Sequence, residues 1–183
     1  MQDHSFHEKF TASLINWHRN RYPNIDNTPN EQSLISLNIL CSNILLPIQN
    51  EFGEVSVTYG FTSHSLLKEI QKFNPIHIAP KLDQHASNEV NSKGKLICDR
   101  GGAACDIFVV GFENKMHEVA KWAADNLPFD RIYLYGNDRP IHISIGPEHS
   151  RFIQVMNTNK DGKRFPGKKG ISKQFTSIIG ENQ

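Results

Sequence analysis

One aspartate in this sequence occupies a position where a carboxylate needs a partner. Residues 101–111 read GGAACDIFVVG, so Asp106 follows a run of small residues and leads directly into an apolar run. A carboxylate at the start of a buried strand is costly unless it is ion-paired, hydrogen-bonded or bound to a metal. The pattern therefore predicts a partner for Asp106.

Two histidines are candidate partners. In residues 140–145, PIHISI, the period-two alternation places the isoleucines on one face of a strand and His142 on the other. His85 lies in the long polar segment that precedes Asp106. If these side chains converge on one face of a sheet, one carboxylate and two imidazoles form a three-ligand zinc site with an open fourth position, as a catalytic zinc requires.

The first half of the chain predicts mainly helices. Apolar residues at helical spacing indicate a first helix that ends before Tyr22. A second helix begins at the capping-box pattern of residues 28–31, with a proline at its first helical position, and ends at Gly53. Residues 55–61 alternate like a strand, and residues 63–73 return to helical spacing.

The second half of the chain predicts the sheet. Residues 74–100 lack periodicity and form a long loop, after which residues 107–112 read as a short buried strand. Residues 113–127 are helical, and residues 131–145 contain two strands separated by turn residues. The predicted fold class is therefore α+β, with helices packed on one small antiparallel sheet.

Composition indicates an ordinary globular protein, with 183 residues, 38% apolar residues and a mean hydropathy of −0.48. No apolar run is long enough to span a membrane, and residues 1–20 lack the features of a secretion signal, so we expect a cytoplasmic protein. We expect one domain over residues 1–150 and a basic, flexible extension over residues 151–183. The basic residues of this extension include Lys160, Lys163, Arg164, Lys168, Lys169 and Lys173.

Four segments of the chain resemble one known family. VTYGFTSHSLLKE at residues 57–69 resembles the V-T-S-G-Y-R-S-x-x-L-N segment of the zinc D-Ala-D-Ala carboxypeptidases and L-alanyl-D-glutamate endopeptidases. QH at residues 84–85 and GAACDI at residues 102–107 resemble the Q-H and G-x-A-x-D-I of that family's ligand motif, and PIHIS at residues 140–144 resembles its closing W-V-H-V-S. The resemblance covers roughly residues 31–146.

The resemblance implies a hedgehog/DD-peptidase fold in which His85, Asp106 and His142 bind Zn²⁺ and water is the fourth ligand. The implied activity is hydrolysis of a peptide (amide) bond by a metal-activated water, in a peptide or a peptidoglycan fragment of the cell wall. The lack of a visible secretion signal fits a phage or prophage lysis enzyme, or a cytoplasmic dipeptidase, better than an exported carboxypeptidase.

One departure from the family pattern concerns the first metal ligand. The family's histidine and aspartate are seven residues apart, so its match to His85 requires an insertion, residues 86–99. An alignment without this gap would place Asp99 at the histidine position. Gln84 favours His85, and the insertion would then form a loop beside the metal that shapes the binding site.

A second departure concerns the substrate. Thr62 stands where the family has the arginine that binds a substrate carboxylate, and threonine cannot form that bidentate, charged contact. Arg100 or Arg139 would have to replace it. Ser63 matches the serine of the family segment, and its type also suits the cap of the following helix.

The general base is the third departure, because the family places it a few residues before the last histidine. Asp138 is the nearest acid and is the predicted catalytic base, with Glu89 in the insertion and Glu148 as alternatives.

Two other functions stay open from the sequence. The basic extension would suit the same metal fold acting on, or binding, a phosphorylated or nucleic-acid ligand, because clustered lysines favour phosphates. Alternatively, the chain is a non-catalytic module in which the zinc is structural.

Overall fold

A computed structural model of the chain describes residues 2–73 and 80–179. In chain order the elements are α1 (Gln2–Asn16), α2 (Glu31–Leu40), the π-turn η1 (Cys41–Leu45), α3 (Leu46–Phe52), β1 (Val55–Tyr59), α4 (His64–Phe73), the 3₁₀ turns η2 (Pro80–Leu82) and η3 (Gln84–Ala86), β2 (Ala103–Val109), α5 (Met116–Asn126), β3 (Arg131–Leu134), β4 (Ile141–Ile145), β5 (Phe152–Thr158), β6 (Arg164–Ile171), the 3₁₀ turn η4 (Ser172–Gln174) and α6 (Phe175–Ile179).

The strands form one six-stranded sheet in the order β1-β2-β4-β3-β5-β6. The α+β class is confirmed, but the expectation of a purely antiparallel sheet is wrong because β3 and β5 pair in parallel. After the β3–β4 hairpin the chain turns back through residues 146–151 and returns to the free edge of β3, so β5 runs in the same direction as β3. His149 and Arg151 adopt positive φ angles of 45° and 50° in this return.

The helices α2 and α3 form one continuous rod with η1 between them, as predicted from the apolar stripe. The rod begins at Asn30, whose side chain accepts the Ser33 N–H; the predicted cap lay two residues earlier. Pro47 explains the π-turn, since it has no N–H to donate and its ring crowds the preceding turn. The Leu46 N–H bonds to the Cys41 carbonyl, five residues back.

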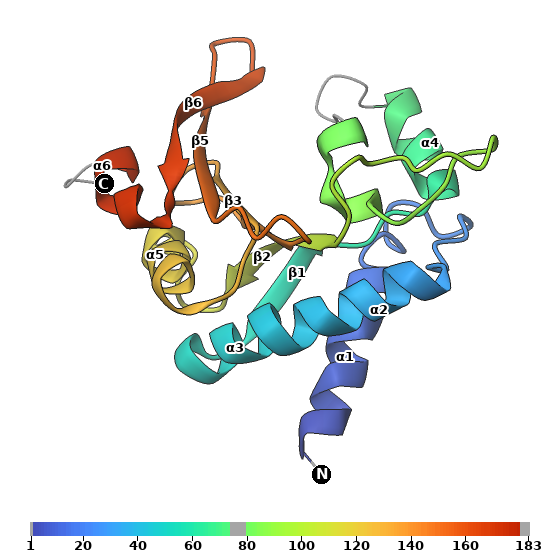
Figure 1. The fold of residues 1–183 in the computed structure, drawn as a ribbon, viewed down its shortest axis with the longest axis horizontal. Helices are drawn as coiled ribbons and strands as arrows, with labels where there is room; N and C mark the ends of the chain where they lie inside the picture. The colour runs from blue at the N-terminus through green and yellow to red at the C-terminus, as the bar shows by residue number, and fades with distance from the viewer. Residues whose placement is uncertain (1, 74–79, 180–183) are drawn as a thin grey trace.

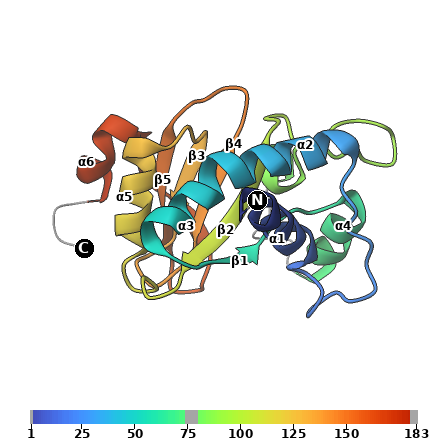
Figure 2. The same cartoon turned by 90° about the horizontal axis from the view of Figure 1, so that it is seen from below.

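The larger of two apolar clusters lies between the sheet and the helices; the smaller one consists of Leu67, Ala86 and Ile97. Figure 2 shows α2 and α3 in front of the sheet, with α5 beside them. Ile141, Ile143 and Ile132 of the sheet are buried in the same cluster as Leu40 and Ile44 of the rod. The predicted inward face of β4 is therefore confirmed.

The described part of the expected extension, residues 151–179, is an integral part of the fold. They supply β5, β6 and α6, and the β5–β6 hairpin projects beyond the other strands in Figure 1. The boundary expected at residue 150 therefore cuts through the sheet. The sequence of β6, RFPGKKGI, does not have a typical strand pattern. β6 is a solvent-exposed edge strand, and edge strands tolerate proline and glycine.

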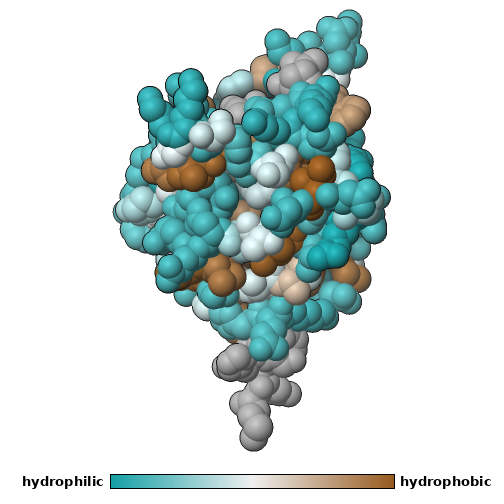
Figure 3. Space-filling model, turned by 90° about the vertical axis from the view of Figure 1, so that its right-hand side faces the viewer, coloured by the Kyte–Doolittle hydropathy of each residue, from teal (hydrophilic) through white to brown (hydrophobic). Residues whose placement is uncertain are grey.

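The surface on the side of α2 and α4 is mostly hydrophilic, with small, separate apolar patches (Figure 3). None of the described helices has the length and apolar character needed to cross a membrane.

Candidate metal centre

A row of side chains crosses the sheet on the face opposite the α2–α3 rod. The strand register pairs Asp106 of β2 with both Tyr59 of β1 and His142 of β4, and pairs His142 with Tyr133 of β3. Tyr133 in turn pairs with Gln154 of β5. Directly paired residues lie on the same face of a sheet, so the predicted approach of Asp106 and His142 on neighbouring strands is confirmed.

Three potential metal ligands converge at the centre of this row. His142 Nδ1 lies 2.9 Å from Asp106 Oδ1, and His85 Nε2 lies 3.4 Å from the same oxygen and 3.2 Å from His142 Nδ1. In a tetrahedral zinc site with ligand distances of about 2.0 to 2.1 Å, neighbouring donor atoms are roughly 3.3 Å apart. The donor set and its spacing therefore fit a metal ion, and this cluster could bind one.

The His85 ring is oriented by its surroundings. Its Nδ1 lies 2.9 Å from the Gly60 carbonyl, which can only accept a hydrogen bond, so Nδ1 carries the proton and Nε2 is left as the ligand atom. The main chain is held as well, because the His85 N–H donates to Asp83 and its carbonyl accepts from the Thr62 N–H. Gly60 and Thr62, in the segment after β1, thus hold the ring and main chain of His85, which lies in a loop distant in sequence.

Electrostatics make the cluster attractive to a cation. Burial alone would raise the pKa of Asp106, but hydrogen bonds from His142 and His85 hold that pKa well below its usual range. Burial alone would lower the pKa of His85, whereas the charge of Asp83 and the contact with Asp106 outweigh burial and raise it. The site therefore carries an ionised carboxylate and favours positive charge between the two imidazoles, where a metal would compete with a proton.

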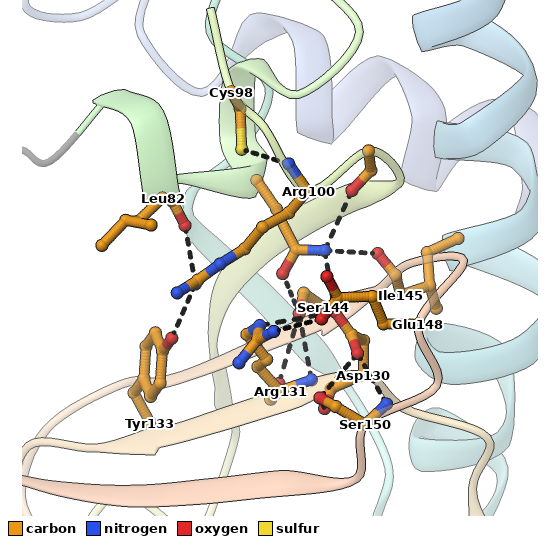
Figure 4. A network of polar contacts seen from close by, with 12 residues as sticks. Leu82, Cys98, Arg100, Asp130, Arg131, Tyr133, Ser144, Ile145, Glu148 and Ser150 are labelled. Carbon is orange, nitrogen blue, oxygen red and sulfur yellow. Dashed lines mark hydrogen bonds and ion pairs between the residues drawn. The ribbon is translucent and has the colours of Figure 1, made fainter.

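A buried amide joins the loop that carries His85 to the strand that carries His142. Gln84 Nε2 is within hydrogen-bond distance of the Gly101 and Ile145 carbonyls and of Asp130 Oδ2, and Gln84 Oε1 accepts from Ser144 Oγ. Figure 4 shows this network from close by. The Q-H dipeptide of the sequence resemblance thus contains one potential metal ligand, His85, and one residue, Gln84, whose hydrogen bonds hold its loop against β4.

Asp130, at the far end of the network, is fully buried. Its oxygens also accept hydrogen bonds from the Ser150 N–H and Oγ (Figure 4). Burial opposes ionisation of Asp130, but the bonds from Ser150 and Gln84 and the nearby Arg131 charge hold its pKa below the usual value. Asp130 is therefore a charged, hydrogen-bonded anchor behind the three potential metal ligands.

The small residues before Asp106 allow a close approach of the backbone. Gly102 has a φ of +85°, and a side chain there would collide with the Ile145 carbonyl of β4. Its own carbonyl accepts hydrogen bonds from Ser87 and Asn88 in the insertion. The insertion is thereby tied to the start of β2, beside the ligand strands.

The three ligands lie in a cleft of about 880 Å³. One side of this cleft is formed by the segment that follows α1, including Trp17, Arg21 and Tyr22. The other side is formed by the β5–β6 hairpin, which contributes Gln154, Met156, Arg164 and Pro166. A volume of this size is typical of small-molecule sites.

The acids predicted as the general base lie elsewhere. Asp138 is on the β3–β4 turn with 71% of its side chain exposed, close to Arg139, and does not line the cleft. Glu89 is buried at the start of α2, where it accepts hydrogen bonds from the Asn30 N–H and Ser33 Oγ. Glu148 pairs with Arg131.

The predicted substrate-binding residues divide into two groups. Arg100 lines the cleft, whereas Arg139 is 62% exposed on the turn outside it. Thr62 and Ser63 are buried; Ser63 Oγ accepts the Leu66 N–H and thus caps α4. The structure therefore assigns Thr62 and Ser63 to the scaffold.

Asp83 is a cleft residue that the sequence reasoning missed. Its Oδ1 lies 3.9 Å from His85 Nε2, and the side chain lines the cleft beside the three ligands. The only signal in the sequence is an acid two residues before a candidate ligand, whereas the family pattern places the base close to the last histidine.

Comparisons of this chain with family models, curated proteins and solved structures found no match. The structure by itself defines an α+β protein with one mixed sheet and a His-Asp-His cluster in a cleft, which could bind a metal ion.

Proposed function

We propose that this chain is a zinc-dependent hydrolase of the DD-peptidase type that cleaves an amide bond with a metal-activated water. The observation that carries the proposal is the convergence of His85, Asp106 and His142 within one cleft, with donor atoms at tetrahedral spacing. Two imidazoles and one carboxylate are a donor set found in catalytic zinc sites. When bound, zinc supplies a water of lowered pKa and polarises the scissile carbonyl.

Asp83 is the general base in this proposal. It is the one carboxylate, apart from the ligand Asp106, among the described residues that line the cleft, and it lies 3.9 Å from a ligand nitrogen. It would accept a proton from the attacking water and return it to the leaving amine. Asp138 is a weaker candidate, because a base must reach the reacting atoms and Asp138 points into solvent.

The arrangement of the resembling segments supports the DD-peptidase assignment. The segment after β1 orients His85, the small residues precede Asp106 on β2, and His142 lies on the adjacent β4. Three of the four stretches therefore supply the residues that the resemblance implies as metal ligands, and the fourth, after β1, orients His85. A peptide or peptidoglycan fragment is the proposed substrate, with Arg100 in the cleft as its anion-binding residue.

Metal analysis of the purified protein is the first test. We expect about one equivalent of zinc, retained in Asp83→Asn and lost in His142→Ala. Absence of bound metal after incubation with zinc would overturn the proposal.

Turnover of a panel of muropeptides and synthetic peptides is the second test. Asp83→Asn should reduce kcat by about 10²- to 10⁴-fold, as expected for loss of a general base, while its zinc content is unchanged. Asp138→Asn is the matched control and should retain activity. Bound zinc without turnover of any amide in the panel would instead support a non-catalytic zinc module.

A further inference from the structure

Arginines outnumber carboxylates among the described residues that line the cleft. Among the described lining residues, Arg21, Arg100 and Arg164 are cationic, whereas Asp83 and Asp106 are anionic and Asp106 belongs to the metal cluster. A bound metal would add further positive charge. A cleft with this balance concentrates anions and repels cations.

Two of these arginines contact tyrosines that line the cleft, Tyr133 of β3 and Tyr135 just after it. Arg100 Nη1 is 3.0 Å from the hydroxyl of Tyr133, and the Arg164 guanidinium lies 4.3 Å from the ring centre of Tyr135. Tyr133 also stacks on His142, with ring centres 4.9 Å apart. Both tyrosines line the cleft, so both guanidinium groups are held beside the ligand strands.

Neither guanidinium forms an ion pair with any carboxylate of the part of the chain that the structure describes. Other arginines have more partners: Arg131 pairs with Asp130 and Glu148, and Arg151 donates to Ser172 Oγ and to the Leu127 and Ala124 carbonyls. Arg100 Nη1 donates to the Leu82 carbonyl as well as to Tyr133, but no other guanidinium nitrogen of Arg100 or Arg164 has a hydrogen-bond partner among the described residues. Both arginines line the cleft and therefore keep donors available to a ligand.

We infer that Arg164, carried by the β5–β6 hairpin, acts with Arg100 to bind an anionic group, a carboxylate or a phosphate, of a small substrate beside the metal cluster. The guanidinium fork suits both anions, and the tyrosines fix its direction. The inference deepens the proposed function by naming a substrate class, and it gives the C-terminal hairpin a role as the specificity wall of the cleft. The size of the cleft favours a small anion over a polymer.

The test is anion binding to the metal-stripped protein, so that neither zinc nor turnover contributes. Trp17 lines the cleft, which allows titration with inorganic phosphate and with succinate by tryptophan fluorescence. We expect at least one of the two probes to bind, and the one that binds more tightly identifies the source of the anion. Arg164→Ala and Arg100→Ala should each weaken binding by about 10-fold, and Arg164→Lys should recover part of the loss.

Lys163→Ala is the matched control, because it removes a neighbouring exposed cation from the same hairpin. It should change binding by less than about twofold, and circular dichroism should show that Arg164→Ala stays folded, since Arg164 lies on an exposed edge strand. Equal losses in Lys163→Ala and Arg164→Ala, or no binding of either anion, would overturn the inference. So would tight binding of single-stranded DNA that depends on the hairpin lysines but not on Arg164. These outcomes are separate from the zinc and turnover results that decide the proposed function.

Discussion

The two faces of the sheet are both buried, but by different means. On β4, Ile141 and Ile143 pack into the apolar core under the rod, while His142 and Ser144 of the same strand are buried and form hydrogen bonds, His142 with Asp106 of β2 and Ser144 with Gln84 of η3. The helix-covered face is held by non-directional apolar packing. The cleft face is held by directional polar contacts whose partners come from the neighbouring strand β2 and from the distant η3 loop. We infer that stability resides mainly in the first face and chemistry in the second.

His142→Ala is the strongest test of this difference between the two faces of the sheet. We expect zinc affinity to fall by more than the roughly 100-fold that loss of a supporting residue costs, because one of three protein ligands is removed. Zinc titration followed by a competing chelator measures the affinity. Retention of stoichiometric, tight zinc in this variant would contradict the assignment of the cleft face.

For the adjacent residue, Ile143, we expect the opposite result: a loss of stability without a loss of zinc binding. Ile143→Ala should lower the free energy of unfolding by about 2–5 kcal/mol, because it leaves a cavity in a fully buried apolar cluster. Urea denaturation measures this loss. Zinc stoichiometry of the folded protein should stay unchanged; a variant that lost zinc affinity without losing stability would show that the two faces are not separable.

Gln84→Ala tests whether the polar network positions the ligands. The change removes an amide that contacts Asp130, Ser144 and the Ile145 carbonyl, so we expect a stability loss of about 1–3 kcal/mol. Zinc affinity should fall by about 10- to 100-fold because the His85 loop is no longer tied to β4. Gln32→Ala, on the exposed side of α2, is the control and should change neither quantity.

The smallest expected effect concerns pH. The pKa of Asp130 is lowered in the folded state, so this carboxylate stabilises the fold above its unfolded pKa of about 3.9, and the stabilisation is lost as the pH falls through its folded pKa. One such group changes stability by at most about 1.4 kcal/mol per pH unit. Urea denaturation of the metal-stripped protein between pH 7 and pH 3 should show a smaller acid-dependent loss for Asp130→Asn than for the unmodified chain. Equal losses would show that Asp130 does not anchor the cleft face.

The sequence predicted the central elements well where the pattern is local. The rod that ends at Gly53, the strand β1 and the helix α4 follow from periodicity that tertiary contacts only reinforce. The start of α2 was misplaced by two residues because Thr28 and Asn30 are both good caps, and only the fold decides between them. The edge strand β6 was missed because its composition is that of a loop.

The sequence by itself determined that His142 lies opposite the isoleucines of β4 and that Asp106 needs a partner, because side-chain alternation and the cost of burying a carboxylate are local properties. Only the tertiary structure decided that Asp83, and not Asp138, lines the cleft, and that the C-terminal hairpin brings Arg164 beside the ligands. The order of strands in the sheet and the path of long loops depend on contacts between residues far apart in the chain, and no local pattern records them.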